Sequence, residues 1–194
     1  MLFNSLQFAI FFPIVTTLFF LLPQRGRVPL LLVASCVFYM AFIPKYILIL
    51  FGLILTDYSA GLLIERSAGR RRTAWLVLSL CANLGILGVF KYFNFLSDNL
   101  TALAHWLGWN YSLEHLGIIL PIGLSFHTFQ SMSYTIEVYR GRQAAERSLL
   151  VFAVYVLFYP QLVAGPIERP QNLLHQFRAY HRFSWANLGQ GLRL

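Results

Sequence analysis

Residues 120–141, LPIGLSFHTFQSMSYTIEVYRG, have the length and hydropathy of a membrane-spanning helix that also carries polar side chains. On a helix of about 3.6 residues per turn, these side chains share one face within an arc of roughly 80°, and they are His127, Gln130, Tyr134 and Glu137. Polar groups are costly in the hydrocarbon of a bilayer. Two interpretations therefore stay open: the polar stripe hydrogen-bonds neighbouring helices, or it lines a substrate cavity.

The composition of the chain indicates an integral membrane protein. Of its 194 residues, 58% are hydrophobic and 11% are charged, whereas soluble domains carry about 25% charged residues. The chain has fifteen basic and seven acidic residues, and the basic residues lie in short clusters between apolar runs. This arrangement is typical of membrane topology signals and argues against nucleic-acid binding.

The order of apolar runs predicts an all-α, polytopic transmembrane helix bundle. The runs cover residues 2–22, 28–43, 46–64, 73–96, 118–139 and 149–164. Between them, the loops at 23–27, 65–72 and 140–147 are basic, whereas those at 43–45 and 97–117 are almost without Lys and Arg. Because basic loops mark the cytoplasmic side, we expect a multi-pass protein of the plasma (inner) membrane with five crossings and its N-terminus outside.

The sixth apolar run, 149–164, conflicts with a simple sixth crossing. If it crossed, the basic tail at 165–194 would lie outside the cell. Pro160, Pro166 and Pro170 lie close together here, and prolines at this density break helices. Broken helices occur at membrane depth where protein encloses them. We therefore predict a re-entrant segment, with the tail returning to anionic lipid on the inner surface.

The remaining polar side chains predict no reaction on their own. Asp57 lies within a span, and a buried carboxylate needs a partner, so we interpret it as structural. Cys36 and Cys81 lie in apolar runs and are expected to be small buried side chains. No histidine has the spacing of a metal site, and we expect neither a metal nor a bound cofactor.

Five segments, in order along nearly the whole chain, resemble one known family. They are MLFNSLQF at 1–8, LTDYSAGLLIER at 55–66, KYFNF at 91–95, LPIGLSFHTFQ at 120–130 continuing to VYRG at 138–141, and YPQLVAGPIER at 159–169. Together they resemble the membrane-bound O-acyltransferase family. The similar branch is the bacterial one that contains the alginate O-acetyltransferase and the teichoic-acid D-alanyl transferase.

This resemblance implies an enzyme that transfers an acyl group to a hydroxyl of an extracellular polysaccharide, and we expect the group to be acetyl and the polysaccharide to be one such as alginate. The implied donor is an acyl thioester, and partner proteins in this branch often pass the acyl group on. The family's catalytic histidine lies in a later span, in a motif resembling Trp-His-Gly that this sequence does not contain. We therefore expect residues 1–194 to be an N-terminal part that is inactive alone, with the catalytic histidine beyond Leu194.

Position within the matching segments indicates candidates for lining or ordering a substrate tunnel. They are His127, Gln130, Tyr134, Gln161, Glu168 and Arg169. His127 occupies a place where the family more often carries an aromatic residue, so no catalytic role is assigned to it. Arg169 and the basic tail could attract an anionic carrier or a phosphate-bearing donor, or they could serve only as a topology signal.

Two other classes of membrane protein compete with the acyltransferase. A transporter or channel subunit would need inverted repeats or paired broken helices, and the sequence has one broken segment and no evident repeat. A non-catalytic membrane scaffold would tolerate substitutions in the polar stripe without loss of function. The five-segment resemblance favours the acyltransferase over both.

Overall fold

The computed structural model describes residues 3–41, 44–109, 123–162 and 168–191 of the chain. These ranges contain helices and no strand, which confirms the predicted all-α fold. The elements are α1 (Leu6–Leu21), α2 (Gln24–Met40), η1 (Pro44–Tyr46), α3 (Ile47–Arg66), α4 (Gly69–Trp106), α5 (Leu124–Tyr139), α6 (Leu149–Leu157), α7 (Pro170–Leu173) and α8 (Trp185–Gly191).

Two helical segments are long and apolar enough to cross a membrane, Pro44–Arg66 and Gly69–Trp106. The helix Leu6–Leu21 is also apolar but shorter. With the apolar composition, these helices identify a membrane protein. The predicted count of five crossings and one re-entrant segment stays a prediction at this point.

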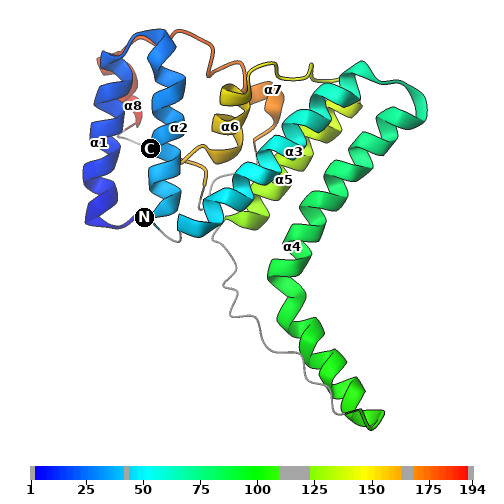
Figure 1. Ribbon diagram of the computed structural model, residues 1–194. Coiled ribbons are helices and arrows are strands. Elements are labelled where there is room, and N and C mark those ends of the chain that lie inside the picture. The colour runs from blue at the N-terminus through cyan, green and yellow to red at the C-terminus, as the bar shows by residue number, and fades with distance from the viewer. Residues whose placement is uncertain (1–2, 42–43, 110–122, 163–167, 192–194) are drawn as a thin grey trace.

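The helices form a bundle around α3. It packs against α4 and α5 along its length and against α6, while α6 also packs on α2. Figure 1 shows α1 and α2 side by side, with α3 and α5 crossing the centre of the molecule. The C-terminal half of α4 extends away from the other helices in the same view. The core therefore lies where α3, α5 and α6 meet.

A glycine allows the close approach of α3 and α5. A β-carbon at Gly61 would lie 2.7 Å from the ring and the hydroxyl of Tyr134. Such contacts are closer than real side chains make, so no larger residue fits without movement. The Tyr134 ring also packs on Phe152 of α6, with 4.5 Å between ring centroids. One tyrosine thus joins α3, α5 and α6.

The helix that contains the fourth predicted span, 73–96, continues ten residues past position 96 to Trp106. Polar residues follow position 96, but none of them is a proline that would stop a helix. The helix ends at a glycine signal instead: Gly108 has φ +75°, and Trp109 N–H donates to Ala104 O at 2.8 Å. This is the hydrogen bond of a Schellman motif.

Other element boundaries also differ from the prediction. The second helix begins at Gln24 instead of residue 28, so the basic loop at 23–27 is largely its first turn. The sixth helix ends at Leu157, and with about 1.5 Å of rise per residue it is only about 14 Å long. Residues 2, 42–43, 118–122 and 163–164 of the predicted spans lie outside the described residues.

Cys81 is exposed and Cys36 is half-buried, which corrects the prediction that both are buried.

Candidate functional site

The polar stripe of α5 contacts the C-terminal end of α6. The last carbonyls of any helix lack partners within that helix, and here two of them face α5. The Nδ1 atom of His127 lies 2.7 Å from Val156 O, and Gln130 Nε2 donates to Tyr155 O at 2.6 Å. Since a carbonyl oxygen only accepts, Nδ1 of His127 carries the hydrogen. The stripe therefore supplies hydrogen-bond donors to the carbonyl oxygens at the C-terminal end of α6, inside the bundle.

The chain that follows α6 is also fixed by hydrogen bonds. The hydroxyl of Tyr155 donates to Glu168 O at 3.1 Å, and Tyr159 N–H donates to Ser35 Oγ of α2 at 3.2 Å. Gly123, which caps the start of α5 with φ +80°, leaves no room for a side chain, because a β-carbon there would lie 2.6 Å from Leu162 O. The residues that follow α6 are thus held against α2 and the start of α5.

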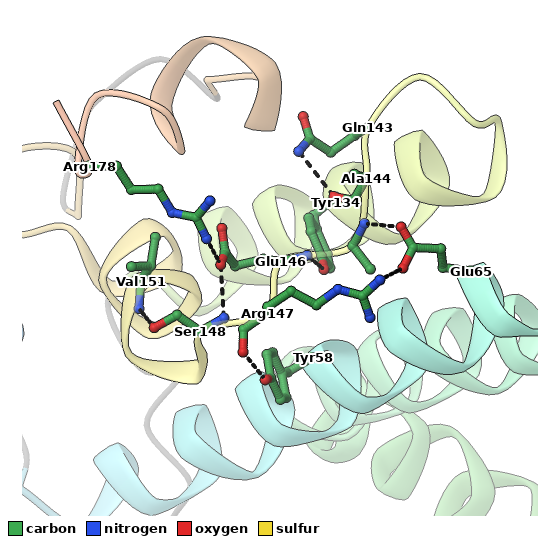
Figure 2. Close-up of polar contacts among 11 residues, drawn as sticks. Tyr58, Glu65, Tyr134, Gln143, Ala144, Glu146, Arg147, Ser148, Val151 and Arg178 are labelled. Carbon is green, nitrogen blue, oxygen red and sulfur yellow. Dashed lines mark hydrogen bonds and ion pairs between the residues drawn. The ribbon is translucent and has the colours of Figure 1, made fainter.

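We call residues 144–148, with the side chains that bind them, the loop cluster (Figure 2). Tyr134 Oη accepts from Glu146 N–H at 2.9 Å. Glu65, at the end of α3, accepts from Ala145 N–H at 3.0 Å and forms an ion pair with Arg147. These contacts tie the α5–α6 loop to the ends of α3 and α5.

The loop cluster also reaches the C-terminal tail. Glu146 is buried, and its carboxylate accepts from Ser148 N–H at 2.8 Å and forms an ion pair with Arg178 (Figure 2). Ser148 in turn caps the N-terminus of α6 by accepting from Val151 N–H. One carboxylate therefore links the start of α6 to the tail.

A second buried polar cluster joins α3, α4 and α5. Asp57 is fully buried. Its carboxylate accepts from Ser79 Oγ at 2.5 Å, from Asn83 Nδ2 at 2.9 Å and from Ser131 Oγ. Since the donors come from α4 and α5, this cluster fixes three helices against one another. The arrangement agrees with a structural role for Asp57, whose partners are two hydroxyls and an amide.

The structure places the six predicted site residues in two groups. His127, Gln130 and Tyr134 are fully buried on one face of α5, where the first two face α6 and the third faces the loop cluster. The other group follows the break in α6 and consists of Gln161, which is half-buried, Glu168, which accepts from Asn172 Nδ2 at 3.3 Å, and Arg169, which is exposed. In this group the backbones of two residues bind the α6 region: Glu168 O accepts from Tyr155 Oη, and Gln161 N–H donates to Phe158 O at 3.0 Å.

A tunnel-lining role for these residues stays a prediction. Three of their buried polar atoms have no partner among the described residues: His127 Nε2, Gln130 Oε1 and Gln161 Oε1. Buried polar atoms normally bind protein or water, so these atoms could bind a polar molecule. Within the described residues, no three His, Cys, Asp or Glu side chains converge to hold a metal.

Sequence reasoning missed several residues that fix this region. Ser79 and Ser131 were overlooked because serine is common in membrane helices. The spacing of Ser79 and Asn83 does indicate a polar cluster, since the two residues are four apart and so share a helix face. Tyr155 was overlooked because it lies within an apolar run, where its hydroxyl was the only sign of a polar role.

Comparisons with known proteins give relatives that act on polysaccharides. The chain is 41% identical, over 91% of its length, to the protein named "Probable alginate O-acetylase AlgI" of Pseudomonas aeruginosa, and equally identical over the same share to the Pseudomonas putida protein of that name. The chain is therefore similar in sequence to proteins named as probable alginate O-acetylases. It is also 29% identical, over 99% of its length, to the "Peptidoglycan O-acetyltransferase" of Helicobacter pylori.

This relationship confirms the resemblance predicted from the five segments. The chain spans about a third of the length of the two proteins named as probable alginate O-acetylases, 34% for P. aeruginosa and 37% for P. putida, and 42% of the H. pylori protein. No protein-family model matches the chain, and no solved structure matches it.

Proposed function

We propose that this chain is the N-terminal part of a membrane O-acyltransferase that transfers an acetyl group to a hydroxyl of an extracellular polysaccharide. The observation that carries the proposal is the 41% identity, over 91% of the chain, to proteins named as alginate O-acetylases. The apolar helices agree with an enzyme that works within a membrane. An acyl thioester is the proposed donor, and proteins that pass the acyl group on are the proposed partners.

The proposed topology has five crossings and a re-entrant segment, with the N-terminus outside the plasma membrane. Its support is that basic segments far apart in sequence meet at one end of the bundle. Arg72 Nη2 donates to Tyr139 O at 2.6 Å, which joins the start of α4 to the end of α5. Gln24 Nε2 donates to Ala179 O at 2.8 Å, which joins the start of α2 to the tail.

The re-entrant segment is supported by the length of α6 and by the position of the tail. A helix of about 14 Å does not cross a hydrocarbon layer of about 30 Å. The ion pair between Glu146 and Arg178 brings the tail back to the loop that precedes α6. A chain that enters and leaves at the same end therefore agrees with both observations.

In this proposal the stripe on α5 orders the re-entrant segment beside the path of the acyl group. His127 and Gln130 hold the end of α6, and Tyr134 holds the loop at its start. Gln161, Glu168 and Arg169 would border the same path after the break. The general base that takes the proton from the acceptor hydroxyl would come from a later segment of the complete enzyme.

Deleting the gene in its own organism tests this function. We expect the deletion strain to lose most of the alkali-labile acetate from its extracellular polysaccharide, and a plasmid copy of the complete gene to restore it. The measurement is the acetate released by mild base per unit of polysaccharide. An unchanged acetate content in the deletion strain would contradict the proposal, provided that polysaccharide yield is also unchanged.

A further inference from the structure

A cavity of about 290 Å³ lies between α1, α2 and the residues on both sides of α7. Most of its wall is apolar, and the large side chains in this wall include Phe12, Leu31, Phe158 and Phe177. The polar side chains Gln24 and Arg27 line it as well. Its volume is at the small end of the range for ligand pockets, about 300–1,000 Å³. The cavity is separate from the contacts between α5 and α6.

Arg27 is a buried cation in this wall. Its side chain is only 5% exposed. Nη1 donates to His181 O at 2.7 Å and Nε donates to Leu22 O at 3.2 Å, while the guanidinium lies over the rings of Phe19 and Tyr180 at 4.9 and 5.1 Å. All of these partners are neutral.

No carboxylate among the described residues pairs with Arg27, whereas Arg147 and Arg178 both have one. A buried charge without a counter-charge is costly. An anion in the cavity would remove this cost.

The start of α2 adds to the attraction for an anion at the same place. The helix begins at Gln24 without a side-chain cap. Of its first N–H groups, that of Gly26 donates to Pro23 O at 2.8 Å, and together they carry the positive end of the helix dipole. Gln24 Oε1 is buried without a partner among the described residues. It can accept a hydrogen bond from a hydroxyl group. A phosphate therefore fits beside Arg27 and a hydroxyl beside Gln24, and hydrocarbon fits the apolar part of the wall.

We propose that this cavity binds one anionic phospholipid from the surrounding membrane. Its phosphate would lie at Arg27, a headgroup hydroxyl would donate to Gln24 Oε1, and part of one acyl chain would lie against Phe12, Leu31 and Phe177. Phosphatidylglycerol has this chemistry, whereas phosphatidylcholine lacks both the net charge and the hydroxyl. The bound lipid would hold the tail against α1 and α2. This proposal is independent of the acetyl-transfer function.

The test compares two lipids of identical acyl chains in the purified gene product. We expect phosphatidylglycerol in mixed micelles to raise the melting temperature by about 4 °C or more over phosphatidylcholine, because a ligand that binds only the folded state stabilises it. Arg27→Gln should abolish this difference. Arg25→Gln is the matched control, since Arg25 lies two residues away and is exposed, and it should keep the difference.

Native mass spectrometry gives a second, independent measurement. Leu31→Trp fills the cavity but keeps every basic residue, so we expect it to lose the tightly bound lipid adduct, while Arg27→Lys should keep it. Equal melting temperatures of the unsubstituted protein in the two lipids would overturn the proposal. So would an equal loss of the difference in Arg25→Gln and Arg27→Gln, because it would indicate attraction to the basic surface only.

Discussion

Asp57→Ala is expected to lower the free energy of unfolding by about 3 kcal/mol, because it removes the acceptor for three buried donors. Ser79, Asn83 and Ser131 would keep their hydrogen-bonding groups within the bundle without the carboxylate that now binds them. The measurement is unfolding by increasing SDS in mixed micelles, followed by the loss of helical circular dichroism.

The matched control for this change is Thr56→Ala. Thr56 is the preceding residue of α3, and its exposed hydroxyl donates only to Gly52 O of the same helix, so we expect an effect within about 0.5 kcal/mol. Asp57→Asn should lie between the two variants, since it keeps one acceptor oxygen. An Asp57→Ala protein as stable as Thr56→Ala would mean that the cluster does not hold α3, α4 and α5 together.

Gln130→Leu in the complete enzyme is expected to lower acyl transfer by about tenfold to a hundredfold while protein levels change much less. The substitution leaves Tyr155 O without its donor, so the end of α6 can shift. Displacements of about 1 Å can cost this much activity in a positioned site. The measurement is the alkali-labile acetate on the polysaccharide, divided by the amount of enzyme in the membrane.

The control is Phe129→Leu, because Phe129 is the neighbouring residue on α5 and is 47% exposed. It should keep both the activity and the protein level. If Gln130→Leu keeps normal activity, the stripe does not order the path of the acyl group. If activity and protein level fall together, the stripe serves folding alone.

The helical period explains why the stripe could be predicted from sequence and its partners could not. Spacing alone places His127, Gln130 and Tyr134 on one face, because this is a local property of the helix. Their partners are backbone groups of Tyr155, Val156 and Glu146. Every residue has such groups, so side-chain patterns do not reveal which carbonyls a broken helix leaves open.

For the fold as a whole, local features could likewise be predicted from sequence, whereas contacts between distant residues could not. The all-α class and the break after α6 were predicted, because apolar runs and clustered prolines are local signals. The length of α4 does not follow from hydropathy, because the helix continues through the polar residues after position 96 and ends just before Gly108. The contact between Glu146 and Arg178 joins residues 32 apart, and nothing in either local sequence specifies it.

The most direct test of the account is acetyl transfer in membrane vesicles that contain the complete gene product with its partner proteins. The vesicles receive an acyl thioester labelled with ¹⁴C in the acetyl group, together with deacetylated polysaccharide. We expect the label to appear on the polysaccharide in a base-labile form, and to be absent with vesicles from the deletion strain. Equal labelling by both kinds of vesicle would contradict the proposed function.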